Sequence, residues 1–199
     1  MALLSIRHLW DDVNLGIWAI EETVEQLFEQ YPHLKDLKVY LDEKYKNEGR
    51  KKEILAVRAL LYEMTHEESS KRISHEPSGK PLLKGYFISI SHTKGYAAVI
   101  MSKTRNVAVD IEYVSDRVSK IVDKFIRSDE DSSTIEVQLK NWCAKETVYK
   151  YFSEEDLQYS EMRLHDLSSS HALVDDLKIK KTIDVFFDTN SQYVLAYSY

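Results

Sequence analysis

An alternating run of six residues, Val-Ala-Val-Asp-Ile-Glu at positions 107–112, constrains the fold more than any other short stretch of the chain. Successive side chains of a β-strand point to opposite faces. The run therefore predicts a strand that directs Asp110 and Glu112 to one face and its branched apolar residues to the other. Two acids at the end of such a strand are either a solvated sheet edge or part of a site.

A second run, Trp-Cys-Ala-Lys-Glu-Thr-Val-Tyr-Lys at positions 142–150, is typical of a helix. Trp142, Glu146 and Lys150 are spaced four residues apart and share one stripe of that helix. If the strand and the helix meet, three carboxylates and a lysine converge on one spot. Hard oxygen ligands of this kind suit Mg²⁺, which is commonly held by a few carboxylates together with substrate phosphates.

Each run alone also has an ordinary interpretation. A Glu–Lys pair at this spacing usually supports a helix surface, and acids on a strand usually face water. The two runs gain weight from a pair of upstream elements, Ser-Gly-Lys-Pro at 78–81 and Ile-Ser-Ile-Ser-His-Thr at 88–93.

The order of these four elements over residues 78–150 resembles that of the 4′-phosphopantetheinyl transferases, specifically the larger two-half (surfactin-synthetase-activating) class. That family carries a Gly-(Val/Ile)-Asp-x-Glu-like strand motif and, later, a Trp-x-x-Lys-Glu-(Ala/Ser)-x-x-Lys helix motif. The remaining chain matches it only by length and general pattern.

The resemblance implies an α+β fold of two similar halves packed as a pseudo-dimer, with the active site between them. We expect the halves to span residues 1–102 and 103–199 and to form one unit. The implied activity is Mg²⁺-dependent transfer of 4′-phosphopantetheine from coenzyme A to a serine of an acyl or peptidyl carrier protein, which releases 3′,5′-ADP.

The resemblance also implies roles for individual residues. Asp110, Glu112 and Glu146 are expected to hold Mg²⁺, and Glu146 or a metal-bound water is the expected base. Lys150 is expected to supply a proton or positive charge to the departing 3′,5′-ADP.

The residues expected to contact coenzyme A, most of them through its phosphates, are Arg50, Lys52, Arg58, Lys80, Ser91, His92 and Lys145. For His92 the alternative is a capping or packed histidine, and for Lys145 it is a lysine on the helix surface. Arg50, Lys52 and Arg58 are the candidates for the 3′-phosphate, and one sequence does not fix the register of the helix that begins near them, so the choice among them stays open.

The chain departs from the family pattern in three places. Ala108 stands where the family prefers glycine, and residues 151–156 lack the usual glycine-containing turn. Residues 151–176 hold seven acids and one arginine, a net charge of −6, so an acidic carrier has to be recognised elsewhere or this segment has to point away.

The charge of the chain restricts its partners. The formal net charge is −6, which argues against general nucleic-acid binding. Residues 44–58 carry six cations and two acids, a net charge of +4, which favours a local anionic partner or a solvated helix face.

Composition and targeting signals indicate the compartment. The single cysteine, Cys143, excludes an intrachain disulfide and is predicted to be a small, half-buried side chain rather than a nucleophile. The sequence shows no signal peptide or membrane span, so we expect a cytoplasmic protein, monomeric and without membrane contact.

Hydrophobic periodicity predicts further elements. Helices are expected at 21–30, 53–65, 119–126 and 136–152, and strands at 87–90, 96–101, 106–112, 183–187 and 193–197. In two of the expected hairpins a tyrosine, Tyr96 or Tyr193, opens the return strand after a five-residue connection, which agrees with a duplication.

Two other functions are consistent with these features. The chain could be a non-catalytic module that binds coenzyme A or a carrier protein, in which case Mg²⁺-dependent turnover would be absent. It could also be a Mg²⁺-dependent phosphohydrolase, although that activity leaves the Gly-Lys-Pro, Ile-Ser-His and basic elements unexplained.

Overall fold

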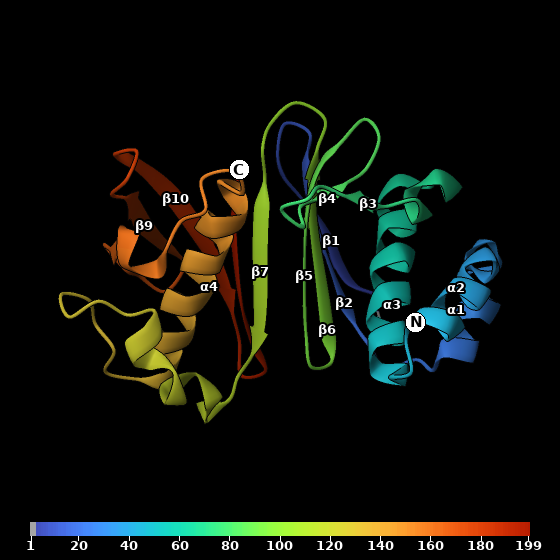
Figure 1. Ribbon diagram of the computed structural model, residues 1–199, viewed down its shortest axis with the longest axis horizontal. Helices are drawn as coiled ribbons and strands as arrows, with labels where there is room; N and C mark the ends of the chain where they lie inside the picture. The colour runs from blue at the N-terminus through green and yellow to red at the C-terminus, as the bar shows by residue number, and fades with distance from the viewer. Residues whose placement is uncertain (1–2) are drawn as a thin grey trace.

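The computed structural model describes residues 3–199, so the first two residues of the expected N-terminal half lie outside it. Two antiparallel sheets stand at the centre of the molecule, with helices on the outer side of each (Figure 1). The first sheet has the strand order β1-β2-β6-β5. Its strands are β1 (Leu3–Trp10), β2 (Val13–Ala19), β5 (Phe87–Thr93) and β6 (Tyr96–Ser102).

The helices over the first sheet all precede β5 in the chain. They are α1 (Val24–Gln30), a 3₁₀ turn (Pro32–Leu37), α2 (Lys38–Lys44) and α3 (Glu48–Thr65). The N-cap of α3 is Asn47, whose side-chain oxygen accepts a hydrogen bond from the Arg50 amide at 3.1 Å. Gly16 lets α3 lie close to β2, because a Cβ at that position would stand 2.7 Å from Leu60 Cδ1. A 3₁₀ turn (Glu68–Lys71) and the short strands β3 (Ser74–His75) and β4 (Pro81–Leu82) lead into β5.

The second sheet has the strand order β7-β11-β10-β9-β8, and one helix covers it. The strands are β7 (Ala108–Tyr113), β8 (Met162–His165), β9 (His171–Asp176), β10 (Lys181–Thr189) and β11 (Tyr193–Ser198). The helix α4 (Ile135–Tyr151) is capped by Thr134 and packs on β7 and β11. Short 3₁₀ turns lie at Asp116–Lys120, Val122–Lys124 and Tyr159–Glu161.

Alternation along the strands divides the apolar residues between the layers. In β6, Ala97, Val99 and Met101 pack in the core beneath the helices of the first sheet, whereas Ala98 and Ile100 pack in the core shared by the two sheets. In β7, Val109 and Ile111 belong to the same shared core. The prediction that the acids of β7 lie on the opposite face is therefore confirmed.

The fold is α+β, as predicted, and the strongest periodic segments form the predicted elements. Helix α3 begins at Glu48, five residues before its predicted start. The helix predicted at 119–126 is wrong: the segment forms two 3₁₀ turns, interrupted at Ile121 with φ −126° and ψ 8°. The sequence pattern did not predict β1, β2, α2, β8 or β9. Strand β2 is buried on both faces and so lacks a polar alternation.

No helix within residues 3–199 is long and apolar enough to cross a membrane.

Candidate active site

Strand β7 and helix α4 bring the predicted acids and one predicted lysine together. Asp110 is buried and its Oδ1 lies 2.7 Å from the Lys150 Nζ, which also donates to the Val109 carbonyl at 3.1 Å. Glu112 lies two residues after Asp110 on the same face of β7, and Glu146 is one helical turn before Lys150. We call Asp110, Glu112, Glu146 and Lys150 the acid cluster.

Strand β5 meets β7 through side-chain hydroxyls, because the two strands belong to different sheets. Ser89, Ser91 and Thr93, at alternate positions of β5, accept hydrogen bonds from the amides of alternate residues in β7. The donor–acceptor distances are 3.1 Å from Val109, 3.2 Å from Ile111 and 3.4 Å from Tyr113. The hydroxyls thereby satisfy amides at the edge of a sheet that would otherwise be buried without partners.

Two of these hydroxyls also orient the acid cluster. Ser91 donates to Asp110 Oδ1 at 2.8 Å, and Thr93 donates to Glu112 Oε2 at 2.8 Å. The third carboxylate receives a hydroxyl from a different part of the chain, since Tyr159 donates to Glu146 Oε1.

The surroundings of the two glutamates favour their protonated forms. Burial raises the pKa of Glu112, and the nearby Asp110 adds to the rise, against the hydrogen bonds from Thr93 and Trp142. Burial likewise raises the pKa of Glu146, against the hydrogen bond from Tyr159. An added positive charge would reverse this balance, because it stabilises both carboxylates in their ionised form.

Asp110 supplies the structural feature that best fits a divalent cation. Its Oδ2 is buried and has no hydrogen-bond partner, which is a costly arrangement for a carboxylate oxygen. Within residues 3–199, no three His, Cys, Asp or Glu side chains already form a metal-binding group. The chemistry of Asp110, Glu112 and Glu146 nevertheless suits Mg²⁺, which takes carboxylate oxygens.

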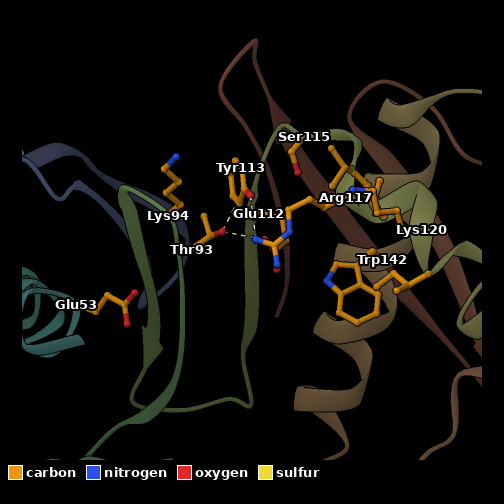
Figure 2. A pocket seen from close by; sticks show the side chains of 12 residues that line it. Glu53, Thr93, Lys94, Glu112, Tyr113, Ser115, Arg117, Lys120 and Trp142 are labelled. Carbon is orange, nitrogen blue, oxygen red and sulfur yellow. Dashed lines mark hydrogen bonds between the residues drawn. The ribbon is translucent and has the colours of Figure 1, made fainter. Parts of the chain in front are cut away.

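A cavity of about 610 Å³ opens beside Glu112 and Trp142 (Figure 2). Thr93 and Glu112 point toward each other at its centre, and Trp142 approaches from α4. Three cations also line this cavity: Lys94, Arg117 and Lys120.

A second cavity, of about 270 Å³, lies on the α3 side of β5. Arg50 and His92 line it, with the Arg50 Nη1 2.5 Å from the His92 Nε2. Glu53 Oε2 lies 2.9 Å from the Arg50 Nη1 and 3.4 Å from the His92 Nδ1. Arg58 lines the same cavity and donates to the Ile54 and Lys71 carbonyls. We call Arg50, Glu53, Arg58 and His92 the basic cluster.

Glu53 is shared by the two cavities, since it lines both of them. Burial lowers the pKa of His92, so the neutral imidazole is favoured in the absence of a ligand. The wall of the smaller cavity also includes the aromatic residues Tyr40 and Tyr45 and the turn residues Gly79 and Pro81.

The partners of Lys145 belong to neither cluster, which argues against its predicted contact with coenzyme A. Its ammonium group is fully buried and lies 2.7 Å from Glu130 Oε2 and 2.6 Å from the Phe125 carbonyl. Burial lowers its pKa, against the hydrogen bond that its ammonium group donates to Glu130. Lys145 therefore has a structural role in joining α4 to the preceding loop.

Of the other predicted residues, Ser91 and His92 contact the clusters, whereas Lys52 and Lys80 line neither of the two cavities. Ser91 donates a hydrogen bond to Asp110 of the acid cluster, and His92 belongs to the basic cluster. Lys52 is half-buried on α3, and Lys80 is half-buried in the turn whose neighbours line the smaller cavity. Cys143 is fully buried rather than half-buried, and burial raises its pKa, which makes it an inert thiol.

Sequence reasoning missed Thr93, Glu53 and Tyr159. Thr93 continues the alternation of Ser89 and Ser91, but it lies beyond the predicted end of the strand at residue 90, whereas β5 runs to Thr93. In the sequence Glu53 stands out only as one of two acids in a basic segment. Tyr159 lies in an irregular segment after α4, where no periodicity marks it.

No family model matches the chain, and no curated protein matches it.

Proposed function

We propose that the protein is a Mg²⁺-dependent 4′-phosphopantetheinyl transferase, which moves the phosphopantetheine group of coenzyme A to a serine of an acyl or peptidyl carrier protein. The observation that carries the proposal is the acid cluster: a strand and a helix join Asp110, Glu112, Glu146 and Lys150, and the buried Asp110 Oδ2 has no partner. Such a transferase also needs a site for the phosphates of coenzyme A, and the smaller cavity offers cations and a histidine for it.

We propose that the chain is a duplication, divided in the loop between β6 and β7 into the expected halves 1–102 and 103–199. Each half then contains a strand, a helix and a hairpin in the same order: β2-α3-β5-β6 in the first and β7-α4-β10-β11 in the second. In each sheet the first of these strands pairs with the last. The rings of Tyr96 and Tyr193, which open the equivalent strands β6 and β11, lie 5.0 Å apart between the halves.

The proposed chemistry assigns a task to each member of the acid cluster. Asp110, Glu112 and Glu146 would hold Mg²⁺, which would neutralise the charge of the coenzyme A pyrophosphate when bound. Glu146, or a metal-bound water that it orients, is the proposed base for the carrier serine. Lys150 is the proposed source of positive charge for the departing 3′,5′-ADP.

The two cavities suggest where the substrates bind. The basic cluster offers Arg50, Arg58 and His92 to the phosphates of the nucleotide. Carrier proteins with an acidic surface would meet Lys94, Arg117 and Lys120 around the larger cavity. A cytoplasmic monomer is proposed, in keeping with the free cysteine and with coenzyme A as cosubstrate.

One observation favours a non-catalytic module that binds coenzyme A or a carrier protein. The Lys150 ammonium already neutralises Asp110, so the cluster has a stable arrangement without a metal. Activity distinguishes the two functions, because a binding module requires no turnover.

The test is the intact mass of several apo carrier proteins after incubation with this protein, coenzyme A and Mg²⁺. A gain of one phosphopantetheine group that disappears with EDTA would support the transferase. Binding of coenzyme A without any gain in mass on any carrier would favour the non-catalytic module.

A further inference from the structure

Each carboxylate of the acid cluster receives a hydrogen bond from a hydroxyl. Ser91 and Thr93, which lie two residues apart on one face of β5, donate two of these hydrogen bonds, and Tyr159 donates the third. Tyr159 differs from the other two because it lies neither in a sheet nor in α4, but in a 3₁₀ turn that follows the irregular segment after α4. Its contact with Glu146 joins two residues that are 13 positions apart.

Aromatic packing holds Tyr159 in place. Its ring lies 5.4 Å from the Trp142 ring, at an interplanar angle of 39°. Trp142 in turn packs edge-on against the buried Phe125, with their centroids 5.1 Å apart. At the start of the turn, Gln158 and Glu161 form reciprocal capping hydrogen bonds. The tyrosine hydroxyl is therefore delivered to Glu146 by a supported segment.

Glu146 requires such a partner because its side chain has three rotatable bonds and projects from a helix. A glutamate that must hold a metal ion, or accept a proton from a substrate, needs one orientation, and outer hydrogen bonds normally provide it. Tyr159 is the donor that the structure gives to Glu146 Oε1.

We infer that Tyr159 is a positioning residue that orients the Glu146 carboxylate toward the divalent cation and the carrier serine. The inference rests on the proposed function and assigns Tyr159 no direct contact with substrate. It also gives the segment after α4 a task, although that segment departs from the pattern of the family the chain resembles.

The test compares wild-type protein with Tyr159→Phe, which keeps the ring on Trp142 and removes only the hydroxyl. Calorimetric titration with Mg²⁺ in the presence of coenzyme A measures metal affinity, and carrier modification measures kcat and KM. We expect Tyr159→Phe to bind Mg²⁺ about 10-fold more weakly, with a comparable loss of kcat, as is usual when an outer hydrogen bond to a metal ligand is removed. The KM for coenzyme A should stay within about twofold, because the basic cluster is untouched.

Tyr149→Phe is the matched control, since Tyr149 lies on the same helix as Glu146 and is 38% exposed. It should match wild type in every measurement. The double variant Tyr159→Phe, Glu146→Gln should bind Mg²⁺ no more weakly than Glu146→Gln alone, because Tyr159 acts through Glu146.

Equal Mg²⁺ affinity and equal kcat in Tyr159→Phe and wild type would overturn the inference while leaving the transferase intact. A lower melting temperature without any change in metal affinity would overturn it too, because it would show a role in folding alone. Absence of Mg²⁺ binding and turnover in wild type would overturn the proposed function and this inference with it.

Discussion

The acid cluster and the basic cluster lie on opposite sides of strand β5 and are built in different ways. In the acid cluster Asp110 is buried and the other members are half-buried, and hydroxyls from Ser91, Thr93 and Tyr159 orient the carboxylates. The basic cluster lines an open cavity, where the Arg50 side chain is 43% exposed and its partner Glu53 comes from the same helix. The first arrangement is suited to stabilising charge during a reaction, and the second to binding an anion from solvent.

Two lysines of helix α4 also differ in exposure and in role. Lys145 and Lys150 both lie 2.7 Å from a carboxylate oxygen, but Lys145 is fully buried with Glu130, whereas Lys150 is partly exposed beside Asp110. The first pair joins the helix to a loop, and the second faces the candidate site. Equal distances thus accompany different roles, and burial distinguishes them.

The largest effect is expected for Asp110→Asn, which removes a charge from the centre of the acid cluster. Turnover should fall by about 10³-fold or more, because loss of a direct metal ligand should exceed the roughly 10–100-fold cost of losing an outer partner. Carrier modification measured by intact mass checks this. Asp184→Asn is the control, since that side chain is 65% exposed and pairs with His171. Near-normal turnover in Asp110→Asn would show that the acid cluster does not carry the chemistry, and its proposed difference in role from the basic cluster would be lost.

Lys145→Met should affect folding rather than chemistry. It leaves the fully buried Glu130 without its cation, and breaking a buried ion pair in this way costs about 3–5 kcal/mol. Denaturant unfolding measures the loss, and turnover per folded molecule should change little. Lys150→Met should show the reverse pattern, with a small loss of stability and a large loss of turnover. If both variants lose only stability, the comparison of the two lysines is wrong.

Arg50→Ala should weaken binding without slowing the chemical step. We expect the affinity for 3′,5′-ADP to fall about 10-fold, since a charge-assisted hydrogen bond contributes about 1.5 kcal/mol or more. The difference from wild type should shrink at high salt, because the site is open to solvent. Calorimetry at two ionic strengths tests this, with the exposed Arg72→Ala as control. An unchanged affinity would mean that the basic cluster is not the nucleotide site.

The smallest effect concerns the pH dependence of stability at Glu146. Its pKa is higher in the folded protein than in the unfolded chain, so folding favours the protonated form. The contribution is fully present below the unfolded value of 4.5 and is lost as the pH rises through the folded pKa. Glu146→Gln should therefore melt a few degrees above wild type near pH 8, at about 2–4 °C per kcal/mol, and this gain should vanish near pH 4. A gain in melting temperature that grows toward low pH would contradict the raised pKa.

Glu146→Gln should also lose turnover and retain coenzyme A binding.

Local periodicity predicts on which faces of β7 and α4 the members of the acid cluster lie. The alternation of β7 and the four-residue spacing of Glu146 and Lys150 each depend on neighbours in sequence, so the faces of the strand and helix were predictable. That the two faces meet is a tertiary fact, and it was anticipated only through the resemblance to a family.

Contacts between distant or irregular segments were not predictable. The partner of Lys145 is Glu130, which lies in a polar stretch between the segments predicted as helices at 119–126 and 136–152, so the sequence does not predict their buried ion pair. Arg50 and His92 are 42 residues apart, and the register of α3 could not be deduced from one sequence. Tyr159 follows an irregular segment, where no periodicity of the sequence predicts which way a side chain points.

Carrier modification by wild type, Asp110→Asn and Arg50→Ala, at low and at saturating coenzyme A with Mg²⁺, tests the central claim most directly. We expect saturating coenzyme A to restore Arg50→Ala to near the wild-type rate and to leave Asp110→Asn inactive. Recovery of Asp110→Asn at high coenzyme A, or a wild-type protein that modifies no carrier, would contradict it.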